Sequence, residues 1–196
     1  MPDSWMIILL LVHERALGSK SYWFPYIDLL PKEFDNALNF SEEEARLLEG
    51  TTLGDTLVRD ANEDLAMLGE RLEGMRSRNP AAFPEDLCGA QALRWAYSVY
   101  WSRALVVPFD SDGNPKAHNH ALCPYLDLLN HCPRSAHRLT SSSTDPGAHA
   151  MVVLAAGSDV TLGSEVTINY GRKSNEQLLL CVLFSNLFVL RPWRLL

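Results

Sequence analysis

The sequence predicts an α+β fold in which helices form the first half of the chain and short strands form most of the second. Two observations lead to this prediction. Apolar residues recur at helical spacing before Val107, whereas short apolar runs separated by turn residues follow it. No glycine-rich phosphate loop follows a predicted strand, which excludes Rossmann and P-loop folds. The 47% of hydrophobic and 21% of charged residues are typical of a globular protein.

The helices of the first half are expected from their apolar spacing and their terminal residues. Residues 6–15 are apolar and should form a helix that ends near Gly18. Ser41 and Glu44 have the spacing of a capping box, in which each residue's side chain bonds the other's backbone N–H at the start of a short helix. Two longer helices are expected at 53–76 and from Pro84 to Arg103.

Short strands are expected near 105–109, 120–128, 150–156 and 165–170. The turn residues at 110–115 predict a hairpin between the first two strands, and the second strand should end at Asn130 and His131. Residues 135–148 are polar and irregular, which favours a surface loop, and a short helix is expected at 174–180.

The charge of the chain, −7 at pH 7, argues against sequence-independent binding to nucleic acid, which requires a basic surface. A basic protein partner suits it better. The apolar run at 5–12 is too short to cross a bilayer and lacks the flanks of a signal peptide. We expect an intracellular protein, cytoplasmic or nuclear, with unpaired thiols, because the cysteines are widely spaced: Cys88, Cys123, Cys132 and Cys181.

Three features could carry chemistry. An apolar run delivers Asp127, Asn130 and His131 at its end, a predicted strand ends in Tyr170, and Arg103 closes a helix. Each feature also has an ordinary structural interpretation: a backbone cap and a core histidine, an edge-strand tyrosine, and a helix-terminal charge. Spacing alone does not decide between these interpretations.

Metal binding and nucleophilic hydrolysis are less favoured. The potential zinc ligands are His118, His120, Cys123, His131 and Cys132, and their spacing matches no common structural zinc pattern, so we expect no metal. The sequence also lacks the Gly-x-Ser-x-Gly motif of a serine-hydrolase nucleophile.

Taken together, the motifs resemble the C-terminal half of a SET domain. They are Asp-Leu-Leu-Asn-His at 127–131, Glu-Val-Thr-Ile-Asn-Tyr-Gly at 165–171 and Lys-Ser-Asn-Glu-Gln-Leu-Leu at 173–179. The Tyr-Gly-x-Lys-Ser-Asn-x-x-Leu run is characteristic of the branch of the RuBisCO large-subunit lysine methyltransferase. The same branch is similar at upstream positions: Glu14, Arg15, Gly18, Ser21, Trp23, Pro25, Tyr26, Leu30, Pro31, Trp95, Ala96, Ser102 and Arg103. The resemblance covers about residues 5–184.

This resemblance implies a partial SET domain with a knot-like crossing near its C-terminal end, an exception to the usual rule against threading. It assigns residues 1–104 to a large helical insert, 105–184 to the C-terminal portion of the SET domain and 185–196 to a tail. The implied activity is S-adenosylmethionine-dependent protein-lysine N-methylation. The implied partner is a protein with a target lysine, and neither nucleic acid nor a membrane is expected.

The resemblance also implies roles for individual residues. Asn130, His131, Arg103 and Phe184 would bind the cofactor, Asp127, Arg103 and Tyr170 would bind the substrate, and Tyr170 would be the catalytic residue. The chemistry fits these residue types, since methyl transfer is an in-line displacement that needs positioning and oxygen atoms near the polarised methyl group, and no metal.

The sequence departs from the family at both ends of the motif set. The family begins with strands that carry a glycine-rich turn against the cofactor, whereas this chain begins at the helical insert. The family's Tyr-Gly-Phe is Val-Leu-Phe at 182–184. We therefore expect the chain alone to bind S-adenosylmethionine weakly or not at all. If the N-terminus is truncated, a chloroplast location also stays open. Two alternatives also stay open: a non-catalytic SET-domain binding protein, and a protein-histidine methyltransferase.

Overall fold

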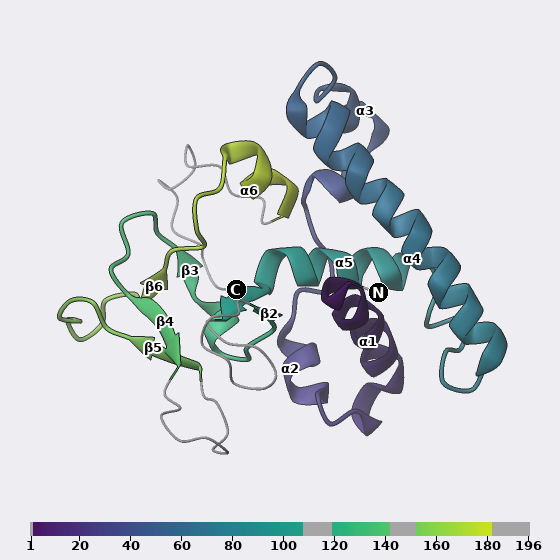
Figure 1. Ribbon diagram of the computed structural model, residues 1–196, viewed down its shortest axis with the longest axis horizontal. Coiled ribbons are helices and arrows are strands. Elements are labelled where there is room, and N and C mark those ends of the chain that lie inside the picture. Colours follow the sequence, from purple (N-terminus) through teal and green to yellow (C-terminus); the bar gives the residue numbers. More distant parts are fainter. Residues whose placement is uncertain (1, 108–118, 142–151, 182–196) are drawn as a thin grey trace. The chain divides into compact units, whose positions relative to one another are not determined.

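The computed structural model describes residues 2–107, 119–141 and 152–181. The described residues fall into two compact units. Residues 2–102 and 173–181 form a helical unit, and residues 103–172 form a second unit that contains the strands. Figure 1 shows the elements of each. The predicted mixture of helices and short strands is confirmed.

The helical unit contains six α-helices among the described residues and three shorter helical segments. The helices are α1 (Asp3–Leu17), α2 (Phe24–Leu29), α3 (Glu42–Arg46), α4 (Arg59–Arg78), α5 (Ala90–Arg103) and α6 (Asn175–Cys181). The shorter segments are the 3₁₀ turns η1 (Gly18–Lys20) and η2 (Ala37–Asn39) and the π-type turn η3 (Leu53–Val58). The predicted helices at 6–15, 53–76 and 174–180 are confirmed, with the second divided into η3 and α4.

The core of this unit is formed by the apolar faces of α1, α4 and α5. On α4 the buried residues recur at helical spacing: Ala61, Leu65, Leu68 and Leu72. Trp95 of α5 is also buried, and its indole N–H donates to the Pro31 carbonyl at 2.8 Å. The guanidinium of Arg15 lies 4.1 Å from the Trp95 ring centroid, so the indole ties α1 to α5.

Helix ends follow the local signals in two of three predicted places. Gly18, at φ 54°, follows α1 as expected. Ser41 and Glu44 form the capping box of α3, with Ser41 N donating to Glu44 Oε2 at 2.8 Å. The predicted helix start at Pro84 is wrong, because α5 begins at Ala90. Residues 84–88 make one turn that ends before Gly89, a residue type that costs about 1 kcal/mol within a helix.

The Lys-Ser-Asn motif has a structural function at the start of α6. Ser174 N donates to Gln177 Oε1 at 2.9 Å, and Gln177 N donates to Ser174 Oγ at 3.2 Å, which is a second capping box. Glu176 Oε1 accepts a hydrogen bond from Leu53 N at 3.3 Å. Leu178 is buried. The motif therefore helps to hold α6 in contact with η3.

The second unit is built from three strand pairs among its described residues. β1 (Leu105–Val107) and β2 (Asn119–Ala121) are antiparallel, as are β4 (Arg138–Ser141) and β5 (Val152–Ala155). β3 (Asn130–His131) and β6 (Thr167–Ile168) form a parallel pair. The pairing of β1 with β2 confirms the predicted antiparallel arrangement, whereas the turn at 110–115 lies outside the described residues.

One strand prediction and one loop prediction are wrong in this unit. The strand expected at 120–128 ends at Ala121, and a 3₁₀ turn, η4 (Leu126–Leu128), follows. Pro124 has no N–H for a ladder, and Tyr125 has a φ of 72°, which is incompatible with an extended strand. Part of the loop expected at 135–148 is strand β4, which is stabilised by backbone pairing with β5 although its residues are mostly polar.

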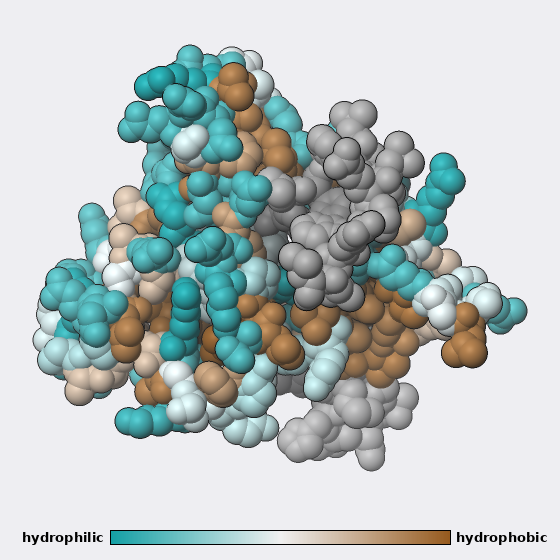
Figure 2. Space-filling model, turned by 180° about the vertical axis from the view of Figure 1, so that it is seen from behind, coloured by the Kyte–Doolittle hydropathy of each residue, from teal (hydrophilic) through white to brown (hydrophobic). Residues whose placement is uncertain are grey.

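Hydrophobic areas interrupt the hydrophilic surface (Figure 2). The most exposed large apolar side chains are those of Tyr22, Leu47, Tyr125 and Leu162. Exposed apolar side chains are common on folded proteins, so this observation alone marks no site. No helix in the described ranges has the length and hydropathy needed to cross a bilayer.

Candidate functional site

The parallel pair β3–β6 brings together the two motifs that the sequence singled out. Asn130 is paired with Thr167, and His131 with Ile168. Cys132 N donates to the Ile168 carbonyl at 3.0 Å. Since Tyr170 follows β6 by two residues, this register places it beside His131.

Tyr170 is held by the segment 129–131 through its backbone, its ring and its hydroxyl. Tyr170 N donates to His131 Nδ1 at 3.1 Å. The Tyr170 hydroxyl donates to the Leu129 carbonyl at 2.6 Å. The two rings lie with centroids 5.0 Å apart at an interplanar angle of 32°. Both ends of the tyrosine are therefore fixed by residues that precede or form β3.

Burial favours the neutral form of both rings. Burial raises the pKa of Tyr170; Arg103 opposes this effect and Asp127 adds to it. Burial lowers the pKa of His131, and a backbone hydrogen bond of Ile168 acts in the opposite direction. Tyr170 can consequently donate one hydrogen bond while its oxygen keeps lone pairs for another contact.

Arg103 and Asp127 lie near this tyrosine. Arg103 Nη1 donates to the Asp127 backbone carbonyl at 3.0 Å, a hydrogen bond within the second unit. Asp127 is only 4% exposed. The buried Arg103 Nε has no hydrogen-bond partner among the described residues. A buried guanidinium N–H without a partner is costly, so this position favours an additional acceptor.

Asn130 has a different environment from the other predicted site residues. Its side chain is exposed, and its Nδ2 donates to Glu165 Oε1 at 2.5 Å. Glu165 was not singled out from the sequence, although it opens the motif that ends at Tyr170. Phe184, the remaining predicted cofactor residue, lies outside the described residues. The contacts thus bring His131 and Tyr170 together, with Arg103 and Asp127 near enough to affect Tyr170.

Tyr125 was also not foreseen from the sequence. It has a positive φ of 72°, although it is neither glycine nor asparagine, and it is 79% exposed. A bulky residue in this backbone region is strained by about 1–3 kcal/mol. The strained turn leads the chain into η4 and hence toward Asp127. Pro124 is the only local signal that a strand could not continue here.

The zinc interpretation gains no support from the described part of the chain. There, no three His, Cys, Asp or Glu side chains are grouped as metal ligands, and His118 lies outside the described ranges. Burial raises the pKa of Cys123, which favours its thiol form and disfavours a metal-binding thiolate.

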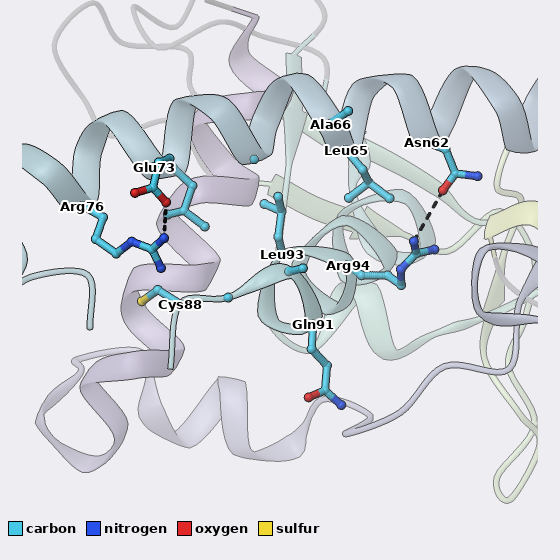
Figure 3. A pocket seen from close by; sticks show the side chains of 13 residues that line it. Asn62, Leu65, Ala66, Glu73, Arg76, Cys88, Gln91, Leu93 and Arg94 are labelled. Atoms are coloured by element: carbon cyan, nitrogen blue, oxygen red, sulfur yellow. Dashed lines mark hydrogen bonds and ion pairs between the residues drawn. The ribbon is translucent and has the colours of Figure 1, made fainter. Parts of the chain in front are cut away.

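The helical unit contains a pocket of about 640 Å³ between α4 and the start of α5. Figure 3 shows α4 along one wall, with Cys88, Gln91 and Leu93 on the other. Arg94 Nη2 donates to Asn62 Oδ1 at 3.5 Å, and Arg76 is paired with Glu73. The pocket contains none of the predicted site residues.

Comparison with protein-family models gives no match. Among curated proteins, the chain is 31% identical to an actin-histidine N-methyltransferase of Drosophila melanogaster over 86% of this chain and 33% of that protein. It is 29% identical to a ribosomal lysine N-methyltransferase of Schizosaccharomyces pombe over 85% of this chain and 28% of that protein. The chain therefore spans about a third of the length of the curated relatives it matches.

Two solved structures are similar over nearly the whole chain. One is the SET domain of LSMT bound to lysine and AdoHcy, with a TM-score of 0.77 and 28% identity, covering 92% of this chain and 40% of that one. The other is RuBisCO LSMT bound to AdoMet, with a TM-score of 0.70 and 26% identity, covering 92% and 39%.

Proposed function

We propose that this chain forms part of the active site of an S-adenosylmethionine-dependent protein-lysine N-methyltransferase. The chain belongs to the SET-domain protein methyltransferases of the RuBisCO large-subunit methyltransferase branch. The observation that carries the proposal is the position of Tyr170. Its ring is fixed against His131 and its hydroxyl against the Leu129 carbonyl. Two oxygen atoms thus lie 2.6 Å apart in a partly buried environment.

These residues fit a sulfonium cofactor. The chemistry of S-adenosylmethionine is the donation of a polarised methyl group, which neutral oxygen atoms stabilise through weak C–H···O contacts. Tyr170 O and Leu129 O provide such atoms, and the raised pKa of Tyr170 keeps its hydroxyl neutral. A neutral hydroxyl leaves the incoming amine free of an ion pair that would hold it protonated.

The free edge of β3 provides a second reason for the assignment. Cys132 N donates to Ile168 O, so in this parallel ladder the backbone N–H and C=O of His131 point away from β6. No strand pairs with that edge among the described residues. The His131 backbone therefore offers one donor and one acceptor to a cofactor. Asn130 and Phe184 are proposed to complete the cofactor side, in agreement with the motif resemblance.

The substrate side is proposed to involve Arg103, Asp127 and Tyr170. The Arg103 guanidinium has an unpartnered buried Nε and contacts the Asp127 backbone. The acceptor is proposed to be a lysine of a protein, as in the relative that is a ribosomal lysine N-methyltransferase. Positioning of the amine in line with the methyl group supplies much of the rate increase, because oriented reactants react as one molecule.

A histidine acceptor is the second candidate. It is favoured by the 31% identity to an actin-histidine N-methyltransferase. The contacts around Tyr170 are compatible with either nitrogen, because both acceptors must arrive neutral and in line with the methyl group.

Methyl transfer from isotope-labelled S-adenosylmethionine to lysine-bearing and histidine-bearing peptides tests the proposal, with mass spectrometry locating the label. At saturating S-adenosylmethionine, which compensates for the weak binding expected of the chain alone, the expected result is label on lysine Nζ, lost in Tyr170→Phe and retained in Tyr125→Phe, an exposed tyrosine of the same unit. Label on an imidazole nitrogen would favour the second candidate. Cofactor binding by calorimetry without any transfer would favour a non-catalytic binding protein, and the absence of both would overturn the proposal.

A further inference from the structure

We propose that the neutral imidazole of His131 is the positioning residue of Tyr170, so that methyl transfer depends on pH through the protonation of His131. This inference rests on the proposed function, because it concerns the same tyrosine. The His131 side chain would position Tyr170, whereas the His131 backbone would contact the cofactor. The basis is the bond from Tyr170 N to His131 Nδ1.

The direction of this hydrogen bond fixes the state of the imidazole. A backbone N–H can only donate, so Nδ1 must accept with its lone pair at 3.1 Å. The ring is therefore neutral, with its proton on Nε2. The ring also lies against the Tyr170 ring, at a centroid distance of 5.0 Å. Both contacts come from one side chain, so any movement of the imidazole reaches the backbone and the ring of Tyr170 together.

Protonation would remove the acceptor. In the imidazolium form both ring nitrogens carry hydrogen, and an Nδ1–H facing the Tyr170 N–H would be a repulsive donor–donor contact. The backbone hydrogen bond of Ile168 acts to raise the pKa of His131 and so favours the protonated ring. The hydroxyl bond to Leu129 at 2.6 Å would then be the remaining hydrogen bond of Tyr170 to the segment 129–131. A displacement of about 1 Å at a reacting centre can lower a rate by about 10²-fold.

The neighbouring groups make His131 the group that responds to mild acid. Tyr170 has a raised pKa and stays protonated in this range. Arg103 and Asp127 lie near the tyrosine, and Glu165 is bonded to the adjacent Asn130. Burial lowers the pKa of His131 below its ordinary value of 6.5, so the neutral ring predominates at pH 7 and protonation occurs in a more acidic range.

Matched variants can separate the acceptor from the rest of the side chain. In His131→Asn, the amide oxygen attached to Cγ can occupy a place close to that of Nδ1 and accept from Tyr170 N without titrating. In His131→Gln, the amide lies one bond further out, near the place of Nε2, and cannot make this contact in the same backbone. The two variants therefore differ in the hydrogen bond and agree in lacking the imidazole.

The first readout is the backbone amide of Tyr170 in the ¹⁵N-labelled full chain, followed by NMR from pH 8 to pH 5. The wild-type amide signal should move upfield in proton shift as His131 is protonated. His131→Asn should show a downfield signal that does not titrate, and His131→Gln an upfield signal at every pH. A Tyr170 amide that is insensitive to pH in the wild-type chain, while the His131 ring titrates, would overturn the inference even if neither variant folds.

The second readout is methyl transfer as a function of pH. We expect kcat of His131→Gln to be lower by about 10²-fold with a smaller change in KM, and His131→Asn to recover part of this loss without the acid limb of the wild-type profile. Equal loss in both variants, with an unchanged acid limb, would contradict the inference. If the amide titrates as expected but the wild-type chain transfers no methyl group, the proposed function fails while the contact between His131 and Tyr170 stands.

Discussion

Replacing Tyr170 by phenylalanine removes one hydroxyl group and leaves the aromatic ring in place. In the structure this hydroxyl donates to the Leu129 carbonyl at 2.6 Å. A neutral hydrogen bond of this kind contributes about 0.5–1.5 kcal/mol of net stability. Tyr170 and Leu129 are both partly buried, so water can reach the freed carbonyl only in part. We expect Tyr170→Phe to lower the free energy of unfolding by about 1 kcal/mol at pH 7, which corresponds to a fall in Tm of roughly 2–4 °C in a chain of this length.

The free energy of unfolding lost in Tyr170→Phe should depend on pH in the alkaline range. The pKa of Tyr170 in the folded chain lies above its ordinary value of 10.0, chiefly because of burial. A raised folded-state pKa stabilises the protein fully below the unfolded-state pKa, and this stabilisation is lost as pH rises through the folded-state value. The difference in stability between wild type and Tyr170→Phe should therefore be constant from pH 7 to about pH 9 and shrink above about pH 10.

Denaturant unfolding at each pH, followed by circular dichroism, measures this difference. Tyr125→Phe is the matched control, since Tyr125 lies in the same unit, is 79% exposed and has no hydroxyl hydrogen bond to any of the described residues. A loss below about 0.3 kcal/mol for Tyr170→Phe would show that the bond to Leu129 contributes less than a typical neutral hydrogen bond. An equal loss in both variants would show that the effect does not come from this bond.

Three further changes test the helical unit by denaturant unfolding. Leu68→Ala, at a fully buried position, should lower the free energy of unfolding by about 2–5 kcal/mol. Met67→Ala, at a 46% exposed position, should lower it far less. Similar losses in the two variants would contradict the assigned buried face of α4. Ser41→Ala should cost about 1 kcal/mol by removing the capping box, and no loss would mean that the cap contributes nothing. Trp95→Phe should cost about 1–3 kcal/mol through the lost bond to Pro31 O, and a neutral result would refute that bond.

The helices of the first half could be predicted because their signals are local. The leucines of α4 recur at helical period, and the Ser41 capping box lies within four residues. Strand β4 could not be predicted in this way, because its residues are mostly polar and its stability comes from pairing with β5. The 3₁₀ turn η4 was missed for a related reason, since an apolar run does not by itself distinguish a strand from a turn.

The candidate site could be predicted at the level of residue types, through the motifs, but not at the level of contacts. The sequence places His131 and Tyr170 in separate motifs, and only the pairing of β3 with β6 makes them neighbours. Asn130 was expected beside them, yet its amide bonds to Glu165, whose side chain lies nearby for the same reason. Side-chain partners of this kind depend on the strand register, because a shift of one residue would turn each side chain to the opposite face of the sheet.

The shortness of β3 and β6 explains why side-chain contacts matter so much at this site. Each strand has two residues, so the ladder offers few backbone hydrogen bonds to hold Tyr170 in place. Longer strands could fix a residue through the sheet alone, whereas here the additional bonds come from His131 Nδ1 and the Leu129 carbonyl. Because these two bonds act on the backbone and on the hydroxyl of the same tyrosine, they restrict both its translation and its tilt. Under the proposed function, Tyr170 on such a short ladder should therefore be sensitive to the chemical state of its neighbours, and His131 is the neighbour whose imidazole gains a proton in mild acid.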